Sequence, residues 1–173
     1  MRVDLEKHFE VLLQDVFTKA GAHVVRLPDD LKVALAQGSS SAKGKRKPYD
    51  FGACFAGHYY AVECKLVKGI FFSSLLVADH QWQGLKEAQL AGATPLLAIY
   101  FKHKVVKKLR GERTETFTEK WVLVDLSCED IDKLRKECFS WRVDWIEEHF
   151  GKFYCRVEDQ LLPSHKCLGE WLP

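Results

Sequence analysis

Two carboxylates and a lysine in this sequence are spaced so that strand geometry would bring them to one surface. Asp50 begins one β-prone run, and Glu63 and Lys65 flank Cys64 in the next. Successive side chains of a strand point to opposite faces, so Glu63 and Lys65 share one face and Cys64 takes the other. An interior face disfavours three charges without a partner. The group fits a hard, oxygen-liganded ion such as Mg²⁺, with Lys65 acting on a water or on charge at a phosphoryl group.

The register of the predicted hairpin decides whether Asp50 joins that face. The runs 49–55 and 59–67 are separated by Ala56-Gly57-His58. A two-residue turn, Ala56-Gly57 or Gly57-His58, places Asp50 opposite Glu63 or Lys65, close enough for the two carboxylates to share one cation. The backbone carbonyl of Cys64 would then be a further ligand. A three-residue turn would reverse the parity, and a surface strand with a simple Glu–Lys pair remains the alternative interpretation.

The elements that must position these residues follow from hydrophobic periodicity and breakers. The pattern predicts a mixed α/β fold whose central sheet is flanked by helices. The expected helices are 3–20, about 80–91 capped by Asp79, and a third capped by Ser127 that ends near 137. The expected strands are 23–27, 49–55, 59–67, 95–101 and 121–126, with a long loop at 28–48 and an extended arm or hairpin at 102–118 turning near Gly111.

Length and composition predict one globular domain over residues 1–173. We expect its core at about 3–126 and a helical, aromatic-rich C-terminal extension at 127–173. Hydrophobic residues make up 47% of the chain and charged residues 29%, which excludes a disordered or fibrous protein. No apolar run is long enough to span a membrane. The six cysteines form no C-x-x-C pair and are interpreted as reduced thiols. The absence of a phosphate-cradling glycine motif argues against a nucleotide cofactor.

Positive charge is concentrated in two segments, although the net charge is only +2. Two such segments suit contacts with a phosphate backbone, whereas two solvated loops are the alternative interpretation. The first segment adds three hydroxyls to its cations, and the second belongs to the predicted arm. The candidate DNA-binding residues are Ser39, Ser40, Ser41, Lys43, Lys45, Arg46 and Lys47 in the first segment, and Lys104, Lys107, Lys108 and Arg110 in the second.

From helix 3–20 to strand 95–101, the order of parts resembles the PD-(D/E)xK nuclease superfamily, and within it the Holliday-junction resolvases of the RecU and archaeal Hjc types. The resemblance implies a restriction-endonuclease-like fold. It also implies that an acid on the first helix completes the metal site, which matches Glu10 here, with Glu6 as the fallback. His80-Gln81 matches a His-Gln pair of the RecU type, so Gln81 is a candidate substrate-binding residue; a helix-start residue capping its own backbone is the alternative. The chain departs from the pattern in placing Tyr49 between Pro48 and Asp50.

The resemblance implies an Mg²⁺-dependent, structure-selective endonuclease that resolves four-way DNA junctions, with Mn²⁺ expected to substitute. The expected catalytic residues are Glu10, Asp50, Glu63 and Lys65, of which the three acids and the Cys64 carbonyl would hold the metal. Two symmetric nicks require two active sites and hence a homodimer. The expected location is the cytoplasm of a bacterial or phage-infected cell, in recombination or repair. A duplex-cutting nuclease of the same superfamily and an inactive junction-binding accessory protein are the alternatives.

Overall fold

A five-stranded mixed sheet forms the centre of the molecule in a computed structural model that describes residues 5–27, 47–109, 112–127, 129–137 and 140–149. Its strand order is β1-β2-β3-β5-β6. The strands are β1 (His23–Arg26), β2 (Phe51–Phe55), β3 (His58–Lys68), β5 (Thr94–Leu109) and β6 (Glu112–Asp125). β3 and β5 pair in parallel, and the other neighbours in this sheet pair antiparallel. The predicted mixed sheet flanked by helices is confirmed.

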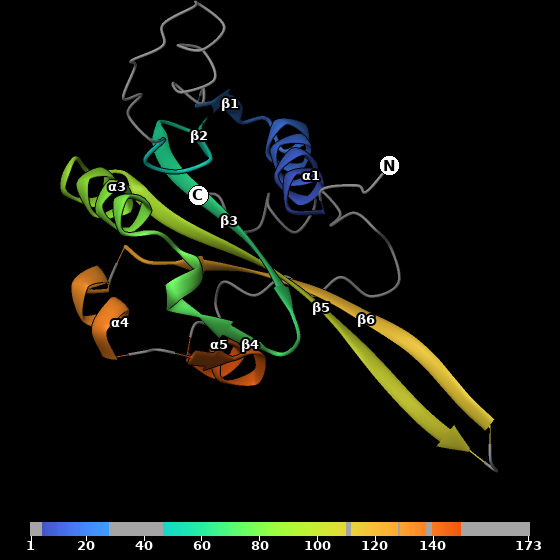
Figure 1. The fold of residues 1–173 in the computed structure, drawn as a ribbon. Coiled ribbons are helices and arrows are strands. Elements are labelled where there is room, and N and C mark those ends of the chain that lie inside the picture. Colours follow the sequence, from blue (N-terminus) through green and yellow to red (C-terminus); the bar gives the residue numbers. More distant parts are fainter. Residues whose placement is uncertain (1–4, 28–46, 110–111, 128, 138–139, 150–173) are drawn as a thin grey trace, which may run out of the picture.

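Both faces of the sheet are covered, so its central strands bury side chains on each side (Figure 1). One face packs against α1 (Leu5–Lys19), whose Phe9, Leu13, Val16 and Phe17 repeat at helical spacing. The opposite face packs against α3 (Asp79–Leu90), α4 (Ile131–Glu137) and α5 (Val143–His149). A short 3₁₀ helix, η1 (Ser74–Leu76), precedes α3.

The hairpin between β2 and β3 has the two-residue turn Ala56-Gly57. Phe55 pairs with His58, and both turn residues have positive φ, 48° and 82° respectively. This is the backbone of a primed turn, whose twist matches that of the flanking strands. The register excludes the three-residue turn. Its last pair is Phe51↔Val62, and beyond it the Asp50 N–H donates to the Val62 carbonyl at 3.0 Å, so the chain continues toward the position opposite Glu63 that a two-residue turn predicts.

Two predicted helix starts are wrong. Asp79 is the first helical residue of α3 rather than its cap, and Ala78 occupies the cap position. α4 begins at Ile131 rather than after Ser127, because the side chain of Asp130 accepts the N–H groups of residues 132 and 133. An acid placed to satisfy the first free amides of a helix determines where that helix starts.

β5 and β6 extend beyond the rest of the sheet as a two-stranded arm (Figure 1). Their pairing continues without a break from Leu96↔Asp125 to Leu109↔Glu112. The predicted arm over 102–118 is confirmed as a hairpin. The strand predicted at 121–126 is the C-terminal part of β6 and not a separate element. Residues 110 and 111, including Arg110 and the predicted turn at Gly111, lie outside the described residues.

Part of the predicted C-terminal extension belongs to the packed body. Ile131, Leu134, Trp141 and Ile146 are buried in the core on the α3 face. β7 (Ser140–Arg142) pairs with β4 (Phe71–Ser73), which follows β3. These apolar side chains, set among many charged residues, pack on the α3 face, although the sequence pattern did not predict where they would pack. Among the described helices, none has the length and hydropathy needed to cross a membrane.

Candidate active site

The site lies at the N-terminal end of β2. Past this point, no strand among the described residues pairs with that edge of β3. The β2–β3 ladder stops at Phe51↔Val62, whereas β3 continues along β5 to Lys68. The carboxylate of Asp50 takes the place of the missing strand, since its Oδ2 accepts the backbone N–H of Cys64 at 2.8 Å. The N–H and C=O of one strand residue point to the same side. The Cys64 carbonyl, the predicted further ligand, is therefore directed to the same edge as Asp50.

A glycine in α3 lets the chain segment before β2 reach this edge. A Cβ atom at Gly84 would lie 2.3 Å from Pro48 Cβ and 2.6 Å from its carbonyl oxygen, closer than packing allows. The segment that carries Lys47, Pro48 and Asp50 is thus seated directly on the helix. Glycine is unfavourable inside a helix. A glycine inside a predicted helix can indicate that another part of the backbone approaches closely at that point. No prediction made from the sequence included this signal.

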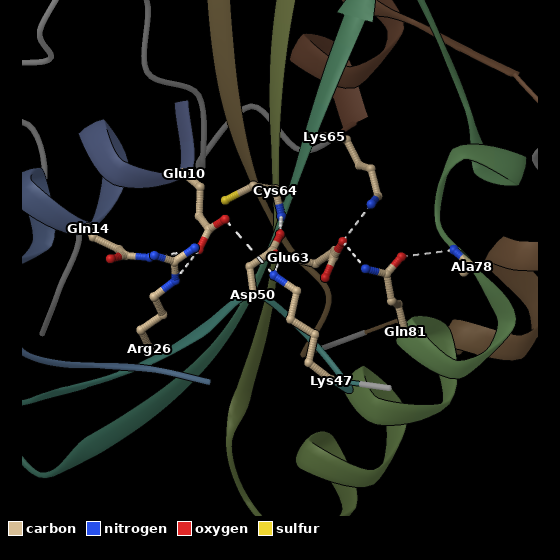
Figure 2. A network of polar contacts seen from close by, with 10 residues as sticks. All are labelled: Glu10, Gln14, Arg26, Lys47, Asp50, Glu63, Cys64, Lys65, Ala78 and Gln81. Carbon is tan, nitrogen blue, oxygen red and sulfur yellow. Dashed lines mark hydrogen bonds and ion pairs between the residues drawn. The ribbon is translucent and has the colours of Figure 1, made fainter. Parts of the chain in front are cut away.

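Glu63 is the most deeply buried charged group of the site, with none of its surface exposed. Its Oε1 lies 2.6 Å from Lys65 Nζ and accepts a hydrogen bond from Gln81 Nε2 at 2.5 Å (Figure 2). Its Oε2 is buried with no hydrogen-bond partner. Burial, and secondarily the charge of Asp50, raise the pKa of Glu63 to about 8, against a lowering effect of Lys65. A buried carboxylate oxygen without a donor is costly and suits a cation.

Gln81 caps the start of α3, the alternative interpretation of its sequence position, and also contacts Glu63, a partner that was not predicted. Its Oε1 accepts the backbone N–H of Ala78 at 3.0 Å and caps the start of α3. Its Nε2 donates to Glu63 and so holds that carboxylate from the α3 side. Gln81 and Leu85, which lie one helical turn apart on α3, are both buried. Its contact with a substrate stays a prediction.

Glu10 approaches the same edge of β3 from α1, on the opposite face of the sheet from Gln81 (Figure 2). Its Oε1 accepts from Gln14 Nε2 at 3.1 Å and lies 3.2 Å from Arg26 Nε. The side chain is buried although its partner Arg26 is half exposed. Sequence analysis did not single out Gln14 or Arg26. The position of Gln14 one helical turn after Glu10 was the signal available for it.

Lys47 is the residue whose place differs most from expectation. Its ammonium donates to Asp50 Oδ1 and lies 4.0 Å from Glu10 Oε2, with 26% of the side chain exposed. Burial lowers the pKa of Lys47, but the hydrogen bond to Asp50 and the charges of Asp50, Glu10 and Glu63 together raise it above its ordinary value. We expected a phosphate contact on a basic loop, and the structure places this lysine within the acidic cluster.

Cys64 contributes backbone rather than thiol chemistry. Its side chain is buried in the core on the α1 face, which confirms the predicted alternation with Glu63 and Lys65. Complete burial raises the pKa of the Cys64 thiol well above its usual range. A thiol kept protonated in an apolar environment is inert as a nucleophile. Cys64 and the exposed Cys54 are free cysteines.

The predicted site residues therefore divide into three groups. The structure brings together Glu10, Asp50, Glu63, Lys65, Gln81 and Lys47. Lys104 is exposed on the arm, apart from the paired part of β2 and β3, and Lys107 and Lys108 belong to β5, where only their backbone is described. Ser39, Ser40, Ser41, Lys43, Lys45, Arg46 and Arg110 lie outside the described residues, as does the side chain of the fallback acid Glu6.

The donor set of the site suits a divalent cation, although its members are not yet assembled around one point. Within the described residues, no three His, Cys, Asp or Glu side chains lie close enough to hold a metal ion as they stand. The carboxylate oxygens of Glu10, Asp50 and Glu63 are hard ligands of the kind that Mg²⁺ prefers. Glu63 Oε2 is available for such a ligand role, while Lys47 takes one oxygen of Asp50.

Comparison with known proteins gives little beyond this geometry. No protein-family model matches the chain. No curated protein matches it either. Among the solved structures, Hjc from Archaeoglobus fulgidus, a Holliday junction resolvase from an archaeal hyperthermophile, matches with 19% identity and a TM-score of 0.48, over 95% of this chain and 99% of that chain. The function proposed next is therefore based on the residues of the site itself.

Proposed function

We propose that this protein is a divalent-cation-dependent DNA endonuclease that cuts four-way junctions. One observation carries the proposal. Acids from three separate elements converge with Lys65 on the unpaired edge of β3, and one of them, Glu63, keeps a buried oxygen without a partner. Most buried polar atoms in folded proteins have a hydrogen-bond partner. The unsatisfied oxygen, on a carboxylate beside two other acids, supports the proposal that this site takes a cation.

The proposed metal ligands are Asp50, Glu63, Glu10 and the carbonyl of Cys64. A divalent ion bound by them would supply Lewis-acid stabilisation of a phosphodiester undergoing attack by water. Mg²⁺ is the natural choice for carboxylate and carbonyl oxygens, and Mn²⁺ should replace it. No nucleotide cofactor is invoked.

The protein's own residues have separable roles in this proposal. Lys65 carries a fixed positive charge beside Glu63, where it would stabilise negative charge on the phosphoryl oxygens or orient the attacking water. Gln81 would hold Glu63 in one orientation from α3. The Cys64 N–H anchors Oδ2 of Asp50, so the orientation of Oδ1, the proposed ligand atom, is set by a contact with the backbone.

The choice of DNA as substrate rests on charge. The segment that contains Lys43, Lys45 and Arg46 lies shortly before Asp50 in the chain, and the arm supplies a second basic stretch. Contacts of this kind bind the backbone without reading sequence. A two-stranded ribbon such as the arm also has dimensions that a DNA groove admits. Paired cuts across a junction would need a homodimer with two such sites.

A cleavage assay tests the proposal on a labelled synthetic four-way junction and on linear duplexes of matching sequence. We expect paired symmetric nicks on the junction with Mg²⁺ and none with EDTA. Asp50→Asn should abolish cutting while junction binding stays equal or becomes tighter, because a charge that repels phosphate is removed. Light scattering should show a dimer.

Three results would contradict the proposal in different ways. Equal cutting of junction and duplex would make the protein a general duplex nuclease. Tight junction binding without metal-dependent cutting would leave an inactive accessory protein. Loss of binding in Asp50→Asn would show that this carboxylate supports the fold or the DNA interface instead of the reaction.

A further inference from the structure

The ammonium of Lys47 lies among the acids to which the metal is assigned. It donates to Asp50 Oδ1 and stands 4.0 Å from Glu10 Oε2 (Figure 2). It reaches them from the segment before β2, whereas Lys65 is on β3 itself. A lysine in this place neutralises a cluster whose carboxylates would otherwise repel each other.

Lys47 and a divalent ion would compete for the same oxygen. Asp50 uses Oδ2 to accept the Cys64 N–H, which leaves Oδ1 as its outward ligand, and Oδ1 is the atom that Lys47 contacts. An ion that is bound at Mg²⁺–oxygen distance to Oδ1 would lie close beside the ammonium. Two cations at such a separation in a partly buried site repel strongly.

Lys65 does not compete in this way. It contacts Glu63 Oε1 and leaves Oε2 of the same carboxylate without a partner. A metal could therefore bind Glu63 while Lys65 keeps its contact. Lys65 is also held by its strand, whereas Lys47 is 26% exposed and has a four-carbon stem that can swing its charge into solvent.

We propose that Lys47 is a built-in counterion that occupies the cation position of the acidic cluster and is expelled when a divalent ion binds. The inference rests on the proposed function, since it uses the same metal ligands. It accounts for the absence of an assembled ligand group among the described residues. The lysine offsets negative charge in the metal-free site, so the free-ion concentration needed to fill the site depends on it.

The exchange is measurable without DNA or turnover, by calorimetric titration of Mg²⁺, and separately of Ca²⁺, into the full chain. Lys47→Gln removes the competing charge and should bind the ion at least about tenfold more tightly than the wild type. Lys47→Arg keeps the charge and should bind much as the wild type does. Lys68→Gln, at the exposed end of β3, makes the same change in net charge away from the cluster and should have little effect.

The stability of the metal-free protein gives a second readout. In EDTA, Lys47→Gln should melt at a lower temperature than the wild type, because its acids repel one another, and Mg²⁺ should raise its melting temperature by more. Circular dichroism establishes that the variant is folded. If Lys47→Gln does not fold, Lys47→Met, which keeps the stem, is titrated in its place.

Several outcomes would overturn the inference. Unchanged metal binding in Lys47→Gln would show that the lysine does not compete with the ion. Weaker binding would show that the lysine helps to hold the ion. An equal gain in metal affinity in Lys68→Gln would show that the effect comes from the net charge of the protein and not from the position of Lys47. These failures differ from failure of the proposed function: a wild type that cuts no DNA, with tighter metal binding in Lys47→Gln, would refute the nuclease and leave the exchange standing.

Discussion

The two lysines of the site illustrate two ways of placing a charge next to a carboxylate. Lys65 shares a strand with Glu63, so the period of the backbone alone brings the two side chains to one face. Lys47 lies three residues before Asp50, but it meets Glu10 only because α1 and the segment packed on Gly84 come together at β3. The Lys65 contact is buried and set by one strand, whereas the surroundings of Lys47 are partly open and completed by the tertiary fold. This difference suggests a permanent role for Lys65 and an exchangeable one for Lys47.

The largest expected effect separates the two lysines in catalysis. Lys65→Gln should lower the single-turnover cleavage rate at saturating Mg²⁺ by roughly 100- to 1,000-fold, because a fixed charge near the phosphoryl group is lost. Its effect on Mg²⁺ affinity should be small. Lys47→Gln should keep most of the cleavage rate under the same conditions. Rapid-quench kinetics on the junction measures both, and equal losses would erase the distinction between the lysines.

The next effect concerns the contribution of the buried Glu63 to the stability of the protein. The pKa of Glu63 is raised from 4.5 to about 8 in the folded protein, by burial first and then by Asp50. Between pH 4.5 and about 8, Glu63 therefore keeps its proton in the folded protein, whereas it has lost the proton in the unfolded chain. In EDTA, this group makes the free energy of unfolding fall as pH rises from about 4.5 to about 8, by on the order of a few kcal/mol.

Glu63→Gln isolates that contribution because glutamine copies the protonated acid in shape. Urea denaturation at pH 5 and at pH 8 measures the free energy of unfolding of both proteins. The value for the variant, relative to that of the wild type, should be higher at pH 8 than at pH 5. Lys65 and Lys47, the cations beside the group, are common to both proteins, so their effect cancels in the comparison. A difference between the two proteins that does not vary with pH would mean that Glu63 is ionised throughout.

A smaller effect tests how Lys47 is held. Gly84→Ala adds a methyl group that would meet the backbone of Pro48 at under 3 Å, so the segment before β2 must move. We expect a net destabilisation of about 1–2 kcal/mol, since the strain exceeds the gain in helix propensity. Gln83→Ala, on the exposed side of the same helix, is the matched control. A stabilised Gly84→Ala variant would show that the Pro48 contact is easily relaxed.

The smallest effect is expected at Arg26. Half of its side chain is exposed, and an ion pair of this kind contributes about 0.2–1 kcal/mol. Arg26→Gln should change the stability of the metal-free protein by no more than that. Gln81→Ala, which removes one of the two donors to Glu63 Oε1 and the acceptor of the Ala78 N–H, should cost about 1–3 kcal/mol. Urea denaturation measures both losses. A larger loss of stability in Arg26→Gln than in Gln81→Ala would contradict the view that the contacts from α3 contribute more to stability than the Arg26 ion pair.

Much of the site could be predicted from the sequence because it depends on local periodicity. Alternation along β3 determined that Glu63 and Lys65 share a face and that Cys64 faces the core. The turn residues Ala56-Gly57 were also evident, but the choice among turn lengths needed the observed register. The helix starts at Asp79 and Ile131 were missed, because side chains from elsewhere in each first turn satisfy the free amides.

The acidic surroundings of Lys47 were decided by tertiary structure. In the sequence this residue ends a basic cluster, and its neighbours suggest a solvent-facing phosphate contact. Asp50 is near in the chain, but Glu10 on α1 and Glu63 on β3, the other acids that act on this lysine, are distant from it. Periodicity reports which residues share a face of one element. It carries no information about which elements meet at the end of a strand, and that meeting determines the charge environment of Lys47.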